Sequence, residues 1–531
     1  MIEHLEDRIA PASIVITTSG AGMKVHGATP ADTLSLIFEA NVTGGFDLFD
    51  PISSDTITVN GATTSPTSNG YTLHFPNITG DITVTGGASA AGNLLEFLNQ
   101  PSQTGVFGGK ITANLPAGNN QVAVGVADIG GALLVTTGPG NDQMVFTDNT
   151  HVGGVTKLSL GNGNNSVGPA TNLAALSFGG SFNYIGGTGS DNVNLTIGAN
   201  GGQGLSVFGN LNYLPGDGAS TLMISSPNVS IGGSLTIKEG NTPSGQSSSV
   251  SINASGSTNP YLAFDVGANL TWSAGPGSHI FNSVTTGFGI GGKLSVSEGG
   301  NGFFNIQAGV AEIGSIKGVV LPAKGTNPAG SGSFGFDATG GSGGILRVGG
   351  SVSLTGFSAV GLNAIGSIAG SVAVSGETSF LMGTSNGPVP LEIGGSVKVT
   401  PLNAAGSSTF TGIQNLRLYG SLAFNGGASA DTVLLDSDQI FGSTKLSMGL
   451  GADTVHFFQD NNVTASLYAG AVTVDFGAET SPFSDTFTAA GSGLPIQFLG
   501  AVKILHDGTS DTISPGTASN VHYAIPLVAT P

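Results

Sequence analysis

A short phrase recurs along almost the whole chain: an apolar residue, two glycines, serine or lysine, and then apolar residues at alternate positions. Clear copies begin at Phe107, Ile129, Phe178, Ile231, Ile290, Val348 and Ile393. Looser copies begin at Ile78, Val152, Val207, Val266, Ile313, Ile368, Leu418, Phe441, Leu467 and Phe498. The copies recur about every 26 residues, a period typical of solenoids in which each repeat packs only on its neighbours.

Within one copy, apolar residues alternate, as Ile231, Leu235 and Ile237 do. A period of two indicates a strand with one face in a core. Paired glycines such as Gly232 and Gly233 indicate a corner where a side chain would clash with the next turn. We therefore predict an all-β fold, a single right-handed parallel β-helix of about 26 residues per turn. The one short helical candidate is Leu94 to Leu98.

Composition supports this prediction. The chain has 531 residues, of which 89 are glycine and 39% are hydrophobic, and regularly spaced apolar residues argue against disorder. A solenoid extends in one dimension, so it can reach this length as one domain. We expect an export-related N-terminal segment at 1–12, an irregular β region or cap at 13–100, and a parallel β-helix at 101–531. Loop insertions are expected near 240–260 and 324–344.

Charge is scarce and mostly negative, with 32 acidic against 13 basic residues and a net charge of −19. Nucleic-acid binding needs clustered Lys and Arg, so we expect no nucleic-acid partner. The chain has no cysteine, which excludes disulfides and thiolate metal sites. No apolar run reaches the roughly 20 residues that a transmembrane helix needs. We therefore expect no transmembrane segment.

Acidic turns follow the phrase at a fixed distance. Asp142, Asn165 and Asp191 each lie 13 residues after the start of a copy, and Asp453 lies 12 after Phe441. These side chains should stack in columns along an acidic edge. Lysines three to five residues after the phrase predict a weakly basic edge; they are Lys110, Lys157, Lys293, Lys317, Lys398, Lys445 and Lys503.

Two interpretations of the acidic turns remain open. Asp and Asn can cap their own turns by bonding to backbone N–H groups. Alternatively, carboxylates and carbonyls of Gly-rich turns are the oxygen ligands that calcium prefers. The candidate metal ligands are Asp142, Asp191 and Asp453; no other cofactor is expected.

The segment Gly186–Asn194 (GGTGSDNVN) resembles the nine-residue calcium repeat of RTX (haemolysin-type) proteins, and the segments 138–142 and 449–453 are partial matches. The resemblance implies calcium binding at these turns. In that family the nonapeptide recurs back to back, so that neighbouring turns share each ion. Here it occurs once per turn, which removes the partner half-site.

The N-terminal residues Leu5-Glu6-Asp7-Arg8 followed by Pro11-Ala12 are similar to a segment that opens many large exported bacterial surface proteins with Gly-rich repeats. The repeat architecture also resembles autotransporter passenger domains and filamentous adhesins. These resemblances imply an exported, extracellular or cell-surface protein with a structural or adhesive role. Its expected partners are surface glycans or proteins, and the sequence does not indicate an oligomeric state.

An enzyme is the main alternative, because parallel β-helices also host polysaccharide lyases and hydrolases. Such enzymes need paired carboxylates, often beside a basic group. Asp436 and Asp438 form the densest acidic pair, and Arg417 could join them in a groove. We interpret the pair as a solvated turn and assign no catalytic or cofactor-binding residue. A third alternative is a calcium-stabilised secreted repeat protein. Trp272, the single tryptophan, is expected to pack inside the stack.

Overall fold

The computed structural model describes residues 13–29, 32–40, 45–51, 55–64, 71–76, 78–88, 92–99, 105–125, 128–147, 149–169, 173–198, 204–255, 263–320, 332–337, 344–384, 389–402, 408–459, 465–477, 484–491, 494–506, 511–517 and 520–530. The expected export segment at 1–12 lies outside these ranges. The chain forms two compact units, Met1–Gly275 (unit 1) and Pro276–Pro531 (unit 2). Every element within the described ranges is a β-strand. The predicted all-β solenoid with turns of about 26 residues is thereby confirmed.

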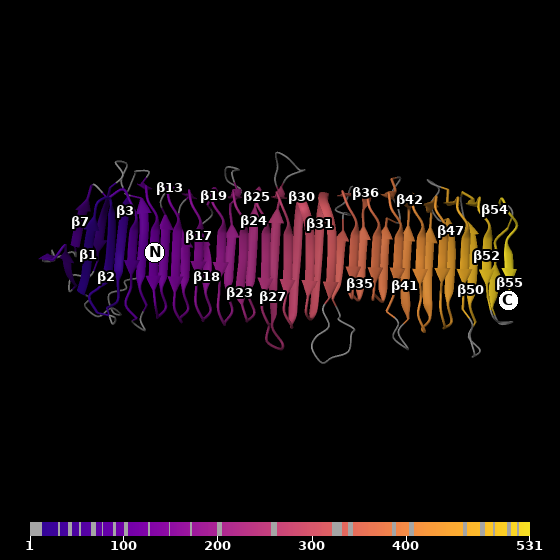
Figure 1. Ribbon diagram of the computed structural model, residues 1–531, viewed down its shortest axis with the longest axis horizontal. Coiled ribbons are helices and arrows are strands. Elements are labelled where there is room, and N and C mark those ends of the chain that lie inside the picture. Colours follow the sequence, from indigo (N-terminus) through magenta and orange to yellow (C-terminus); the bar gives the residue numbers. More distant parts are fainter. Residues whose placement is uncertain are drawn as a thin grey trace. The chain divides into compact units, whose positions relative to one another are not determined.

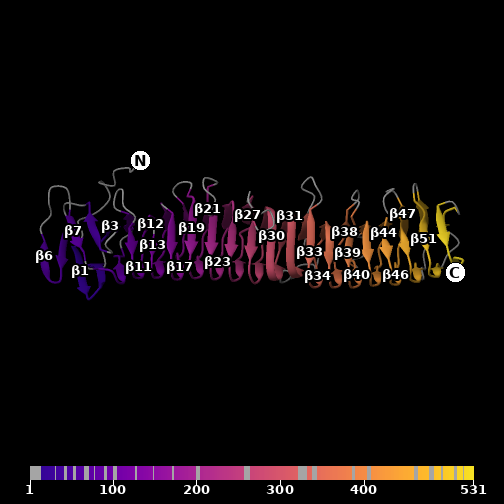
Figure 2. The ribbon, with the colours of Figure 1, turned by 90° about the horizontal axis from the view of Figure 1, so that it is seen from above.

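Each full turn contributes three strands, which stack in parallel on the equivalent strands of neighbouring turns and so form three columns (Figure 1). Column 1 strands end at the first residue of the repeated phrase. Column 2 strands follow the glycine corner, and column 3 strands follow the Gly-rich turn with its Asp or Asn. In Figure 2, column 2 strands such as β17 and β23 in unit 1, and β40 and β46 in unit 2, run along one side of their unit.

The strands of unit 1 fall into the three columns as follows. Column 1 holds β10 (Val106–Phe107), β13 (Asp128–Ile129), β16 (Thr150–Val152), β19 (Ala175–Phe178), β22 (Gly204–Val207), β25 (Val229–Ile231) and β28 (Phe264–Val266). Column 2 holds β2 (Gly22–Gly27), β8 (Ile82–Thr85), β11 (Ile111–Leu115), β14 (Leu133–Thr137), β17 (Thr156–Ser159), β20 (Phe182–Ile185), β23 (Leu211–Gly216), β26 (Leu235–Glu239) and β29 (Leu270–Ala274). Column 3 holds β3 (Ser35–Ala40), β9 (Leu94–Asn99), β12 (Gln121–Gly125), β15 (Gln143–Phe146), β18 (Ser166–Pro169), β21 (Asn192–Thr196), β24 (Thr221–Ser226) and β27 (Ser247–Ala254).

Unit 2 begins with two long strands that bend through all three columns, β30 (Ser278–Glu298) and β31 (Asn301–Val320). Column 1 then holds β33 (Ile345–Val348), β36 (Ile365–Ile368), β39 (Leu391–Ile393), β42 (Leu416–Leu418), β45 (Gln439–Ile440), β48 (Leu467–Tyr468), β51 (Ile496–Phe498) and β54 (Val521–Tyr523). Column 2 holds β34 (Val352–Thr355), β37 (Val372–Ser375), β40 (Val397–Thr400), β43 (Leu422–Asn425), β46 (Thr444–Ser447), β49 (Val472–Asp475), β52 (Val502–Leu505) and β55 (Val528–Thr530). Column 3 holds β32 (Ser333–Asp337), β35 (Ala359–Asn363), β38 (Ser379–Gly383), β41 (Thr409–Gln414), β44 (Asp431–Asp436), β47 (Thr454–Gln459), β50 (Thr486–Gly491) and β53 (Thr512–Ser514).

The repeated phrase sets the register. In unit 1, seven copies pair in direct succession: Phe107, Ile129, Val152, Phe178, Val207, Ile231 and Val266. In unit 2, two looser copies are shifted by one residue from the prediction. Ile440 and Tyr468 occupy the stacked inward position, whereas Phe441 is 42% exposed. Each of these corners has two adjacent apolar residues, Ile440-Phe441 and Leu467-Tyr468, so the sequence alone did not show which of the two points inward.

The glycine corner has the predicted steric cause. A Cβ atom on Gly232 would lie 2.5 Å from the carbonyl oxygen of Phe208 in the preceding turn. A Cβ atom on Gly394 would lie 2.5 Å from the carbonyl oxygen of Ala369. Because real Cβ atoms do not approach that closely, larger residues would force the turns apart.

The first turns of unit 1 differ from the rest. The antiparallel pairs described in the structure join β1 (Ser13–Ser19) to β2, β3 to β4 (Phe46–Asp50), β4 to β7 (Tyr71–Phe75), and β5 (Thr56–Val59) to β6 (Ala62–Thr64). The helical expectation for Leu94 to Leu98 is wrong, because β9 buries Leu95 and Phe97 at alternate positions. Part of each expected insertion is also strand, namely β27 near 240–260 and β32 near 324–344.

Inward side chains stack directly on their counterparts in the next turn. The rings of Tyr184 and Tyr213 lie 5.6 Å apart in unit 1. In unit 2 the ring of Phe498 is stacked between those of Tyr468 and Tyr523, at 5.0 Å from each. Trp272 is fully buried in β29, as predicted. None of the described residues belongs to a helix with the length and apolar character needed to traverse a bilayer.

Candidate functional site

A ladder of polar side chains runs through unit 1 at the turn that precedes column 3. Its seven members are buried, and each lies in a successive turn: Asn93, Asn120, Asp142, Asn165, Asp191, Ser220 and Ser248. We call this set the turn ladder. The side-chain oxygen of each later member accepts the main-chain N–H of the member before it, at 2.8 to 3.2 Å. The predicted stacking of Asp142, Asn165 and Asp191 is therefore present, although in a buried ladder and not along an exposed edge.

The asparagines add a second bond between turns. The Nδ2 group of Asn120 donates to Asp142 Oδ1 at 2.8 Å, and that of Asn165 donates to Asp191 Oδ1 at 3.0 Å. Asn165 thus lies between two aspartates: it donates to the carboxylate of Asp191, and its Oδ1 atom accepts the main-chain N–H of Asp142. Burial nevertheless raises the pKa of Asp191 to about 6, against the two bonds from Asn165 that favour the charged form.

The Gly-x-Gly spacing before the ladder has a steric cause. Gly140, Gly163, Gly189 and Gly218 share φ values between +134° and +152° and stack on one another. A Cβ atom on Gly189 would lie 2.1 Å from the carbonyl oxygen of Gly163. This conformation favours glycine, so the GGxGxD pattern meets the packing needs of a stacked turn.

Unit 2 carries an acidic version of the ladder. The N–H of Asp431 donates to Asp453 Oδ1 at 2.8 Å, that of Asp453 to Asp485 Oδ1 at 2.9 Å, and that of Asp485 to Asp511 Oδ1 at 3.1 Å. Asp511 Oδ2 also lies 3.5 Å from His506 Nδ1. Asp453, Asp485 and Asp511 therefore each accept a main-chain N–H group, Asp431 accepts one from Gly427 at 2.9 Å, and the last carboxylate also lies beside an imidazole.

Calcium at Asp142, Asp191 and Asp453 remains a prediction that this geometry does not favour. Each carboxylate is at most 2% exposed, and its Oδ1 atom accepts at least one N–H group. Calcium takes six to eight oxygen ligands. Within the described part of the chain, no three His, Asp or Glu side chains converge in a way that could hold a metal ion.

The Asp436 and Asp438 pair is not a solvated turn, which corrects the sequence interpretation. Asp436 is 8% exposed and Asp438 is fully buried, because Asp438 occupies the inward position beside Leu416, whose N–H donates to its Oδ1 at 2.8 Å. Burial raises the pKa of Asp438 well above its usual range, and the charge of Asp436 adds to the shift. The Ser437 hydroxyl donates to Asp436 Oδ1 at 2.8 Å.

Arg417 does not join these carboxylates. It lies one position along β42 from Leu416, on the outward face, where its Nη1 atom is 2.7 Å from Glu392 Oε1. Its Nε group donates to the Gln439 side chain at 3.1 Å. Since Asp438 faces the core and Arg417 faces outward, the three residues do not form a catalytic groove.

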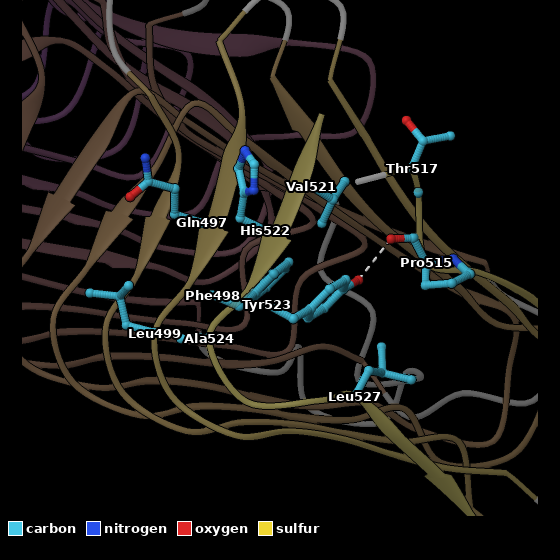
Figure 3. Close-up of a pocket in the computed structure, with 11 residues that line it drawn as sticks. Gln497, Phe498, Leu499, Pro515, Thr517, Val521, His522, Tyr523, Ala524 and Leu527 are labelled. Atoms are coloured by element: carbon cyan, nitrogen blue, oxygen red, sulfur yellow. Dashed lines mark hydrogen bonds between the residues drawn. The ribbon is translucent and has the colours of Figure 1, made fainter. Parts of the chain in front are cut away.

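A hollow of about 700 Å³ lies at the last described turns of unit 2, between β51, β54 and the segment 515–517. Figure 3 shows Tyr523 next to Phe498, and the Tyr523 hydroxyl donates to the Pro515 carbonyl at 2.8 Å. Burial raises the pKa of Tyr523 to about 12. The lining residues include His522 but no carboxylate, lysine or arginine. The hollow therefore offers apolar contact and no pair of carboxylates for glycoside hydrolysis.

Glu239 and Glu377 are among the buried carboxylates that the sequence analysis missed. Glu239 Oε2 accepts a bond from Trp272 Nε1 at 2.8 Å, and Glu377 is 1% exposed with its pKa raised by burial to about 7. The inward period of two through Leu235, Ile237 and Glu239 could have identified the first. The sequence analysis also missed Asn120 and Ser220, because it searched for acidic residues. They follow Phe107 and Val207 by the same 13 residues as the ladder aspartates, so the spacing alone could have identified them.

Comparison with known proteins adds no identification: the chain matches no protein-family model, and neither a curated protein nor a solved structure matches it.

Proposed function

We propose that this chain is a non-enzymatic, exported protein of the cell surface or extracellular space that acts as a structural or adhesive β-solenoid. One observation carries the proposal: outward positions of successive turns form continuous rows of hydroxyl and amide side chains. In unit 1 such a row consists of Asn119, Asn141, Asn164 and Ser190. In unit 2 a second row consists of Ser351, Ser371, Ser396, Ser421 and Ser443.

These rows serve both stability and contact. In the asparagine row and in the serine row as far as Ser421, the side-chain oxygen of one turn accepts the main-chain N–H of a neighbouring turn, as Asn141 Oδ1 does from Asn164 at 2.8 Å. At the end of the serine row the Ser443 hydroxyl donates to the Ser421 hydroxyl at 3.1 Å. The bonds hold these side chains in place at positions that are exposed or half-buried. Repeated polar groups of this kind suit weak, multivalent contact with a partner surface.

The enzyme alternative lacks a matching observation. A carbohydrate-active site would bring carboxylates and a basic group together on adjacent turns, whereas Asp438 and Arg417 lie on opposite faces of their strands. The calcium alternative meets the difficulty that the ladder carboxylates already accept N–H groups.

Antibody labelling of intact cells that produce the protein tests this proposal. We expect labelling before permeabilisation and loss of the signal after mild protease treatment of intact cells. Labelling only after permeabilisation would overturn the proposal. As a test of the enzyme alternative, the purified chain should release no reducing ends from a panel of neutral and acidic polysaccharides.

A further inference from the structure

Four lysines of unit 2 occupy one outward position of column 2. The pairing of strands β31, β34, β37, β40, β43, β46, β49 and β52 places Lys317, Ser353, Ala373, Lys398, Ala423, Lys445, Thr473 and Lys503 side by side in that order. From Lys398 onward a lysine therefore recurs at every second turn. Adjacent strands lie about 4.8 Å apart, so these charges repeat about every 10 Å. We call Lys317, Lys398, Lys445 and Lys503 the lysine row.

The lysine row is exposed, and its lysines have no carboxylate partner in the part of the chain that the structure describes. All four side chains are exposed, and within the described residues none forms an ion pair with a carboxylate. The arginines of unit 2 behave differently, since Arg347 and Arg417 each lie 2.7 Å from a glutamate on the outward face of column 1. Asp475 is the one carboxylate at the described outward positions of column 2 in unit 2.

Hydroxyl and amide groups border the lysine row on both sides. Two residues before it lies the serine row described above. Two residues after it lie Thr355, Ser375, Thr400, Asn425 and Ser447. Ser371 and Ser396 use their oxygen lone pairs on main-chain N–H groups, which leaves each hydroxyl proton available to an outside acceptor. The face therefore combines positive charges, evenly spaced from Lys398 onward, with hydrogen-bonding groups.

We propose that this face of unit 2 binds a linear acidic polysaccharide, with uronate carboxylates on the lysine row and sugar hydroxyls on the bordering side chains. This inference rests on the proposed adhesive function and names its partner class. A single row fits one narrow polyanion that follows the stacking direction. A bilayer or a nucleic-acid duplex is wider than the row and would also approach the surface around it. Because the chain has a net charge of −19, it would repel an anionic bilayer or duplex. A glycan with a carboxylate on each sugar, or on every second sugar, can present charge at each lysine.

The test uses the full chain and polygalacturonate, with fully methyl-esterified polygalacturonate as the neutral probe. The row variant carries Lys398→Gln, Lys445→Gln and Lys503→Gln. The control variant carries Lys110→Gln, Arg347→Gln and Arg417→Gln, which removes the same charge from cations that are already paired. Circular dichroism and thermal unfolding confirm that each variant is folded before affinity is measured by calorimetry.

We expect the wild type to bind polygalacturonate and not the esterified polymer, more weakly as salt screens the charges. The row variant should lose at least about tenfold in affinity because its contacts act together, and the control less than about twofold. Equal losses in both variants, absent binding at low salt, or tighter binding to anionic vesicles or duplex DNA would each overturn the inference. A surface-exposed protein whose row variant binds normally would refute this inference alone, whereas an intracellular location would refute the proposed function alone.

Discussion

Asn165 and Asp191 lie in adjacent turns of unit 1, and both the main-chain N–H and the Nδ2 group of Asn165 donate to Asp191 Oδ1, at 3.2 and 3.0 Å. The relationship shows how a buried carboxylate is accommodated in an otherwise apolar stack. Unpaired polar groups in such a place would be costly. The ladder therefore stabilises the turn without requiring an ion at the Oδ1 atom.

Replacement of Asn165 by alanine should destabilise unit 1. The change removes the Nδ2 bond to Asp191 and the acceptor for the Asp142 N–H, both at a buried position, whereas the main-chain N–H bond to Asp191 remains. We therefore expect a loss of about 2–4 kcal/mol in the free energy of unfolding. Urea titration followed by the fluorescence of Trp272, the single tryptophan, measures it. Asn164→Ala is the control, since Asn164 makes an equivalent but exposed bond and should cost below about 1 kcal/mol. Equal effects of the two changes would contradict a buried ladder.

The glycine column predicts a steric effect that is separable from backbone strain. Gly189→Ala combines a φ of +134° with a 2.1 Å approach to a carbonyl oxygen, and should cost about 3 kcal/mol or more. Gly245→Ala has a φ of +80° but no atom within 4 Å of the added Cβ, so it should cost about 1 kcal/mol. The same urea titration compares them, and equal costs would refute close stacking of the turns.

Stability should rise as the pH falls through mildly acidic values. Burial raises the folded pKa of Asp191 from 3.8 to about 6, so the folded state binds a proton more tightly than the unfolded state. The burial of the charged Asp191 carboxylate therefore lowers the free energy of unfolding by its full amount above about pH 6, and this loss disappears toward pH 4. Glu377, raised from 4.5 to about 7, extends the same trend upward.

Asp191→Asn isolates this effect because it keeps an oxygen acceptor in the ladder. The variant should be more stable than the wild type at pH 7.5 by about 1–3 kcal/mol, and its free energy of unfolding should depend less on pH between 4 and 6. Urea titrations at several pH values give the slope of the free energy of unfolding against pH for the wild type and for the variant. Parallel slopes in the two proteins would show that Asp191 does not titrate in this range.

Sequence periodicity predicted the stack well where each position had one candidate. The copies at Ile231 and Val266 pair as expected, because a single apolar residue precedes each corner glycine at the inward position. At Ile440 and Phe441 two apolar residues compete, and only packing against Leu418 selects Ile440. Similarly, the short Leu94 to Leu98 run fits either period, and pairing with β3 and β12 makes it a strand.

Polar residues were harder to place from sequence. A carboxylate is normally expected at the surface, and this expectation misplaced Asp438. Asp438 lies next to Leu416 of the preceding turn, and the pairing of the two turns gives both residues the inward position. The basic edge was predicted more successfully, since lysines five residues after the phrase, such as Lys398 and Lys503, share one row. Lys110 instead lies at a corner, 3.3 Å from Asp81.

The most direct test of the account is thermal unfolding of the full chain, followed by circular dichroism, first in chelator and then in millimolar calcium. Ligands that bind only the folded state raise the unfolding midpoint by mass action. If the ladder aspartates act as turn caps through the N–H groups that their Oδ1 atoms accept, the midpoint should be the same in both conditions. A large calcium-dependent rise that Asp142→Asn and Asp191→Asn together abolish would contradict the account and make these turns ion sites.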